Sequence, residues 1–307
     1  MPRTHRTSRT PTACSTRCCL PGDDGWPAEG ERRTVAGVNA DIGYFGPDSM
    51  TWQVLADPAA GVGGVRALFL QALHPRAMAA VHGHSDFRES FWPRLQRTAE
   101  YVTTVAFGSR QQVDSAVARV RAMHEVVRGV DPVTGQPYTA GDPELLRWVH
   151  VTEVASILDA VRRGGMGLDD AQADAYLAEQ VRAAELIGVS DVPASHAELV
   201  DYFRDVRPAL RSSPIARNAA LRLAVPPMPV WVQLVTPARP VWTTIAALAF
   251  ALQPGWARRL YGLPGLPTID LTATVTLRAL RTAALRLPQH WRHGPMVREA
   301  MSRATQA

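Results

Sequence analysis

One histidine stands on a helical face that is otherwise apolar. The face recurs every three or four residues and consists of Val113, Val117, Val120, His124 and Val127. An imidazole on a stripe that faces the core needs a partner, because an unpaired buried polar group costs about 1–3 kcal/mol. A metal ion or a backbone carbonyl could be that partner, and the spacing alone does not decide between them.

A second helical face carries an arginine and a hydroxyl group. Its stripe consists of Phe91, Leu95, Thr98, Val102 and Val105. Arg94 lies one turn before Thr98, and Arg97 lies on its flank. A guanidinium and a hydroxyl beside a pocket can orient dioxygen or stabilise an oxyanion. Pairing of Arg94 with an acid such as Asp86 or Glu89 is the alternative.

The remaining histidines give a weaker signal for a metal. His82 and His84 are separated by one glycine and supply only two ligands. His150 and Glu153 are three residues apart, but a di-iron helical bundle needs two pairs in the opposite order. A non-haem metalloenzyme that uses His74, His82, His84 and His150 therefore stays a third hypothesis.

Composition excludes several kinds of chemistry in this chain of 307 residues. All 33 basic residues are arginine, so neither a lysine Schiff base nor a P-loop can form. The three cysteines lie within the first twenty residues, so the rest of the chain has no disulfide and no cysteine-ligated metal. The motifs CxxCH, GxSxG and HExxH are absent, which excludes covalent haem attachment of the c type and two common hydrolase sites.

The elements that position these residues are predicted to be helices. Asp48 or Ser49 is suited to begin one helix, Asp142 begins another, Ser195 with Glu198 forms a capping box, and Gly188 is placed to end a helix. No stretch alternates with period two and no hairpin signal is found, so we expect an all-α, globin-like bundle. We predict a disordered extension at 1–38, a catalytic domain at 39–225, and helices at 226–307 that pack on the same domain.

The charge is unevenly distributed along the chain. Residues 204–307 hold fourteen arginines and three acids, whereas residues 34–203 hold thirteen arginines and twenty-one acids. The basic third also contains an apolar run at 241–252, which is shorter than the roughly 20 residues of a membrane-spanning helix. Trp231, Trp242 and Trp256, with Arg258 and Arg259, suit a membrane interface.

The partner of this basic third can be argued from its composition. Its arginines are not interleaved with stacking aromatics, so we expect no nucleic acid. A helical membrane-surface or lipid-binding protein without turnover is the second hypothesis, and core helices with a solvated basic surface are the plain alternative. We expect a protein that is cytoplasmic, and the alternative is a cytoplasmic protein in peripheral contact with the membrane.

Several motifs, in order, resemble a known family. The segments GPDSMTW, LFLQALHP, HSDF, RLQRTAEYVTTVAFG, MHEVVRGVDPVTGQPY and LLRWVHVTEVAS are similar to the MpaB-type oxygenases, which share a catalytic domain with the latex-clearing rubber oxygenases. The similarity runs from about Gly46 to at least Arg211. It implies a haem-dependent oxygenase or oxidoreductase that acts on a lipophilic small molecule with dioxygen.

The resemblance also implies roles for individual residues. In the rubber oxygenases a helical core holds non-covalent haem b, and His124 matches the histidine that ligates its iron. Arg94 and Thr98 match the pair on the opposite side of the haem. Arg97 stands where some rubber oxygenases have an iron-capping lysine, and an arginine cannot lose its proton to bind iron. Arg97, His74 and His150 are further candidates for contact with the cofactor.

Overall fold

The computed structural model describes residues 41–83 and 91–306. Within these ranges the chain forms fifteen α-helices, one 3-10 turn and one hairpin, and the all-α prediction is confirmed. The elements are α1 (Met50–Leu55), α2 (Pro58–Gln71), α3 (Pro75–Gly83), α4 (Phe91–Phe107), α5 (Arg110–Val126), β1 (Arg128–Val130), β2 (Pro137–Thr139), α6 (Pro143–Arg163), α7 (Asp170–Leu186), α8 (His196–Val206), η1 (Arg207–Ala209), α9 (Pro214–Ala224), α10 (Val230–Val235), α11 (Ala238–Ala251), α12 (Gly255–Leu260), α13 (Pro267–Leu285), α14 (Gln289–Arg292) and α15 (Pro295–Ala304).

Several expectations fall outside the described residues. They are the extension at 1–38 with its three cysteines, His84, and the two acids at 86 and 89 that were considered as partners of Arg94.

Local sequence sets most helix boundaries. The Ser49 side chain accepts a hydrogen bond from the Trp52 amide and begins α1, and Asp142 begins α6 with Pro143 in its first turn. Gly188 follows α7 with φ of 84°, a conformation that favours glycine. At α8 the Ser195 cap forms, but Glu198 accepts from the amide of Ala194, so the predicted capping box is not completed.

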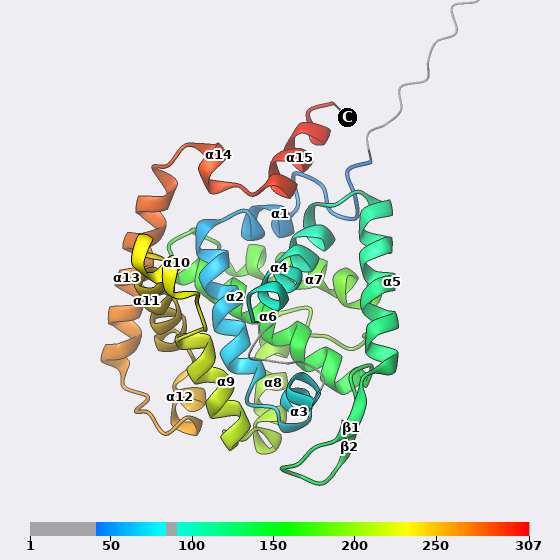
Figure 1. Ribbon diagram of the computed structural model, residues 1–307. Coiled ribbons are helices and arrows are strands. Elements are labelled where there is room, and N and C mark those ends of the chain that lie inside the picture. Colours follow the sequence, from blue (N-terminus) through cyan, green and yellow to red (C-terminus); the bar gives the residue numbers. More distant parts are fainter. Residues whose placement is uncertain (1–40, 84–90, 307) are drawn as a thin grey trace, which may run out of the picture. The chain divides into compact units, whose positions relative to one another are not determined.

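The centre of the molecule is the packing of α2 against α6 (Figure 1). A Cβ atom added to Gly63 would lie 2.7 Å from the Cα atom of Ile157, so only a glycine allows these two backbones to approach so closely. Val62, Phe69 and Val161 are buried in the core that surrounds this contact. The helix pair is therefore a rigid support for the elements packed on it.

The hairpin was missed in the sequence. Its strands pair antiparallel with Gly129 opposite Tyr138, although no hairpin signal was found in the sequence. The connecting turn is held by the Asp131 carboxylate, which accepts from the amides of Val133 and Thr134, and by Gly135 at φ of 71°. Tyr138 is buried and donates to the carbonyl oxygen of Ala79 on α3, so the tertiary contact stabilises strands too short to be recognised by alternation.

Arginines attach the C-terminal helices to the central pair. Buried Arg66 on α2 donates through Nε to the carbonyl oxygen of Leu252, 2.9 Å away, at the end of α11. Arg281 on α13 forms an ion pair of 2.7 Å with Asp57, the residue that begins α2. Among the described residues no helix has the length and apolar character needed to cross a membrane.

Candidate active site

Helices α4 and α5 are joined at one end and diverge in the view of Figure 1, with α6 behind them. The joint is rigid. Ser109 begins α5 with a complete capping box, and the Trp52 indole donates to the carbonyl oxygen of Ala106 over 2.8 Å. Phe107 and Val113 on either side of the joint are fully buried. The closed end therefore fixes the two helices that carry the predicted chemistry.

The side chains of the two helical stripes become more exposed with distance from this joint. On α4, Phe91 and Val105 are buried, but Thr98 between them is exposed. On α5, Val117 is buried, whereas His124 is only half-buried. A core-like pattern that is left uncovered by the described residues is typical of a surface that a ligand covers.

His124 lies in the last turn of α5. Burial lowers the pKa of its imidazole, so the ring is neutral at pH 7. Within residues 41–83 and 91–306 no group forms a hydrogen bond or an ion pair with this ring. Met123, Val126 and Val130, at the end of α5 and on β1, are 53%, 71% and 64% exposed. A neutral, half-buried imidazole fits an iron ligand better than a solvated surface group.

Arg94, Thr98 and Tyr101 lie on one face of α4, because they are four and three residues apart. Arg94 is half-buried and donates to the carbonyl oxygen of Val81 on α3 over 3.4 Å. Burial, and secondarily the charge of Arg97, lower the pKa of the Arg94 guanidinium. The hydroxyl of exposed Thr98 donates to the carbonyl oxygen of Arg94 over 3.1 Å, which leaves its own oxygen able to accept a hydrogen bond.

A half-buried carboxyl group on α6 lies within electrostatic range of α4. Burial raises the pKa of Glu153 on α6 to about 7. Glu153 interacts electrostatically with Tyr101 on α4, and so does Arg121 on α5. Tyr101 is one turn from Thr98, and Arg121 is one turn from His124. These electrostatic interactions relate the predicted residues of α4 and α5 to one region of the fold, which also includes Glu153.

Sequence reasoning considered Glu153 only as half of a di-iron motif. A better signal was available, because Glu153 interrupts a run of α6 in which Val151, Thr152, Val154 and Ala155 are all buried. A carboxylate in such a run is costly unless it is paired or neutral, and therefore indicates a functional group.

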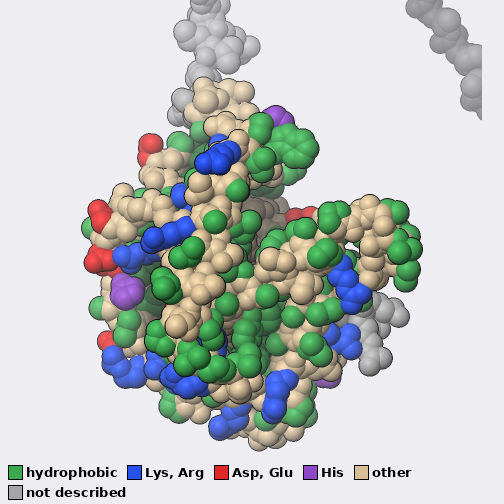
Figure 2. Space-filling model, turned by 90° about the vertical axis from the view of Figure 1, so that its left-hand side faces the viewer, with side chains coloured by type: hydrophobic (Ala, Val, Ile, Leu, Met, Phe, Trp, Pro, Cys, Tyr) green, Lys and Arg blue, Asp and Glu red, His purple; other side chains and the backbone are tan. Residues whose placement is uncertain are grey.

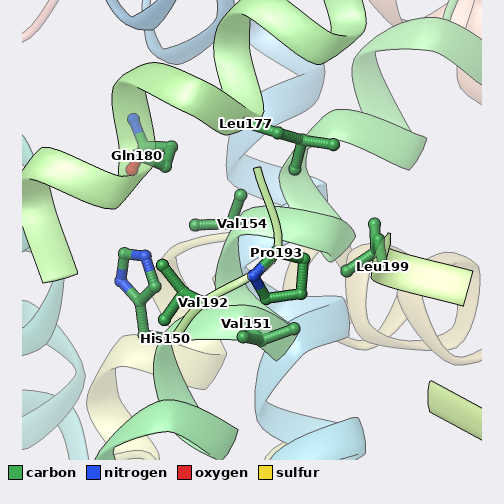
Figure 3. Close-up of a pocket in the computed structure, with 8 residues that line it drawn as sticks. All are labelled: His150, Val151, Val154, Leu177, Gln180, Val192, Pro193 and Leu199. Atoms are coloured by element: carbon green, nitrogen blue, oxygen red, sulfur yellow. The ribbon is translucent and has the colours of Figure 1, made fainter. Parts of the chain in front are cut away.

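His150 occupies a different surrounding from His124. It lines a small cavity of about 10 Å³ between α6, α7 and residues 189–193, about the size of one water molecule. Figure 3 shows its ring on the side of Gln180, away from Leu199. Burial lowers the pKa of His150 to about 4, and a hydrogen bond with the backbone of Gln180 opposes this shift. The ring already has a partner in the protein.

His74 is also engaged within the fold. Its Nδ1 atom accepts from the amide of Ala77 over 3.4 Å at the beginning of α3, and its ring lies 5.9 Å from that of Trp148. Burial lowers its pKa. His82 is exposed on α3. In the described part of the chain no three histidine, cysteine or acidic side chains come together as a metal site, and His84 lies outside it.

Comparison with known proteins gives one match. The family model of the ER-bound oxygenase mpaB/B'/rubber oxygenase catalytic domain matches residues 52–286, which is most of the chain. No curated protein and no solved structure matches. The matched range contains α4, α5 and α6 with every residue of the site described above. The chain belongs to the family of the mpaB and rubber oxygenase catalytic domain, and it carries an oxygenase-type catalytic domain.

Proposed function

We propose that this protein is a haem-b-dependent oxygenase that acts on a lipophilic small molecule with dioxygen. The observation that carries the proposal is the state of His124: neutral, half-buried, and without a partner among the described residues. His74 and His150 are both engaged with backbone groups, so His124 fits the role of iron ligand best of the three predicted histidines.

The residues around His124 fit a flat apolar cofactor. The apolar side chains of Met123, Val126 and Val130 are exposed at the end of α5 and on β1, close to His124 in the sequence. Burying them beneath a macrocycle would remove apolar surface from water at about 25 cal/mol per Å². The two arginines at 94 and 97 would supply cationic groups for the carboxylates of the cofactor or for a polar oxygen species.

Haem iron, when bound, supplies the redox chemistry by which dioxygen can be activated. The chain's own residues would position the cofactor and polarise the oxygen species. Neutral His124 has a nitrogen lone pair available for a metal. Arg94 presents N–H donors from a fixed guanidinium, and Thr98 presents a hydroxyl one turn away. Donors held in place before reaction stabilise developing negative charge without reorganisation.

Glu153 would hold a proton for the reaction. A carboxyl group with a pKa of about 7 exists in both forms near neutral pH, so it can donate or accept a proton at its Oε atoms. The apolar side chains along the open ends of α4 and α5 would hold a lipophilic substrate, since they provide little to recognise a charged one.

The absorption spectrum of the purified protein tests this proposal. We expect an intense Soret band after addition of haem b, and loss of that band in His124→Ala. His196→Ala is the matched control, because His196 is exposed at the beginning of α8 and its removal leaves α5 unchanged. Absence of the band in the native protein, or a band of unchanged position and intensity in His124→Ala, would contradict the proposal.

A further inference from the structure

Helix α10 exposes large apolar side chains to an unusual degree. Val230, Trp231, Leu234 and Val235 are 70%, 67%, 80% and 71% exposed, and no residue of this six-residue helix is buried. A solvated surface helix normally turns such residues toward the core. The exposed face of α10 therefore lacks a partner within the described chain.

The neighbouring helices continue this apolar surface. On α13, Leu271, Val275 and Leu280 are 67%, 58% and 44% exposed, and Trp291 on α14 is 75% exposed. Between Asp270 and Arg278 the outer side of α13 carries no charged residue. Exposed apolar residues grouped in this way indicate an interaction surface.

An open groove of about 430 Å³ lies between α11 and α13. Its lining combines small and apolar residues with threonines: Thr244, Ala247, Leu248, Ala251, Thr268, Ile269, Thr272, Ala273 and Thr276. Figure 2 looks onto the side where α10, α11 and α13 lie in Figure 1. Hydrophobic side chains gather in the hollow of this face, and most of the acidic side chains in view lie along its left-hand edge.

The charge of this surface is positive. Arg239, Arg259 and Arg286 are exposed and form no ion pair with any residue of the described ranges. Asp270 is bound by Arg258 and Arg163, and Glu299 is bound by Arg303, so these acids offer little compensation. The helices and turns of this surface thus combine exposed apolar side chains with arginines that have no acidic partner in the described ranges.

We propose that the face formed by α10, α11, α13 and α14 docks on an anionic phospholipid bilayer. Apolar and tryptophan side chains that enter the interface, with arginines that reach the headgroups, are the combination by which peripheral helices bind anionic lipid. A second copy of the chain fits this face less well, because its arginines would meet those of the partner.

The structure limits which tryptophans take part. Trp242 donates to the carbonyl oxygen of Leu223 and packs against Trp92, and Trp256 packs against Phe203. These two are partly buried within the fold, so Trp231 is the one of the three interfacial tryptophan candidates that is exposed enough to enter a bilayer.

Vesicle flotation of the full-length protein tests the proposal. We expect binding to phosphatidylcholine vesicles that contain phosphatidylglycerol, weak binding to pure phosphatidylcholine, and weaker binding at high salt. Trp231→Glu/Leu234→Glu and Leu271→Glu/Val275→Glu should each lower the partition coefficient about tenfold or more. Each of Arg239→Gln, Arg259→Gln and Arg286→Gln should lower it about fivefold.

Val133→Glu and Val200→Glu are the matched controls, because both residues are exposed, at 41% and 45%, on the hairpin turn and on α8. They should leave binding unchanged. All altered side chains are exposed, and far-ultraviolet circular dichroism should confirm that each variant folds. No binding to anionic vesicles, or equal loss of binding in the controls, overturns the proposal. If the native protein self-associates and the same α10 and α13 variants abolish this self-association, the proposal is also overturned. The face is then assigned to contact with a second copy of the chain. Haem binding in all these variants is expected to be normal, so this test is independent of the proposed function.

Discussion

The ion pair between buried Arg258 and partly exposed Asp270 should respond unequally to loss of its two members. The Arg258 side chain is 1% exposed, whereas that of Asp270 is 42% exposed. Arg258 donates from Nη1 to the carbonyl oxygens of Ala251 and Gln253 at 2.6 and 2.7 Å, and from Nη2 to Asp270 Oδ2 at 2.8 Å. The guanidinium therefore fastens α11, α12 and α13 together.

Removal of the acid leaves a buried charge without its counter-charge. We expect Asp270→Ala to lower the free energy of unfolding by about 3–5 kcal/mol. Arg258→Met leaves a carboxylate that water can reach, and its cost is mainly two carbonyl groups without donors, about 2–3 kcal/mol in total. The double variant should cost little more than Arg258→Met alone, because neither charge is then left unpaired.

Urea denaturation of the four proteins measures these differences, provided that the slope with denaturant is unchanged. The reasoning is refuted if Arg258→Met is the more damaging single substitution, or if the two effects add. A pH series gives a second test. The hydrogen bonds from Arg258 lower the pKa of Asp270, so the stabilisation is full above about pH 3.9, the ordinary value of an unfolded aspartate. It should be lost as the pH falls from there through the lower native pKa.

Three further predictions concern packing, proton binding and the site. Gly63→Ala should lower the free energy of unfolding by about 1–3 kcal/mol, since its Cβ would lie 2.7 Å from the Cα atom of Ile157. Gly61→Ala in the same helix meets no atom within 4 Å and should raise the free energy of unfolding by about 0.5–1 kcal/mol. Thermal unfolding compares the two variants, and equal effects would contradict the packing argument. The pKa of Glu153 in the native state is about 7, above the ordinary 4.5, so the native state holds the proton more tightly than the unfolded chain. The free energy of unfolding should therefore fall by up to about 3 kcal/mol as the pH rises from 4.5 to 7. Glu153→Gln should remove that fall, and an unchanged pH profile of unfolding in this variant would refute the desolvation of the carboxyl group. Arg94→Leu should keep the Soret band but raise the C–O stretching frequency of the carbon monoxide complex, because a cationic group near the bound carbon monoxide is lost. An unchanged infrared band would place this arginine away from the iron.

Much of the fold could be predicted because it depends on local sequence. Ser49, Asp142 and Gly188 fix helix ends through their own side chain or backbone, and each lies where expected. The hairpin at 128–139 could not be predicted, because its strands depend on Tyr138. This side chain is buried and donates to Ala79 on α3, which is 59 residues away in the sequence. The Glu198 side chain accepts a hydrogen bond from the amide of Ala194 and not from that of the cap residue Ser195, a difference of one residue that a sequence pattern does not specify.

The site was predictable one helix at a time. Periodicity placed Arg94 and Thr98 on one face of α4 and His124 on the predicted stripe of α5, and the structure adds that these stripes are uncovered around those residues. The electrostatic interaction of Tyr101 with Glu153 could not be predicted from the sequence, because it depends on where α4 and α6 lie in the fold. The haem itself stays a prediction that the free imidazole of His124 supports.

Replacement of that imidazole tests the central claim most directly. His124→Gly should bind haem b with a weak and shifted Soret band, and added imidazole should restore the native band by supplying the missing nitrogen from solution. A native band in His124→Gly without imidazole would show that the iron is held elsewhere, and the account of α4 and α5 as the two sides of a haem site would then be wrong.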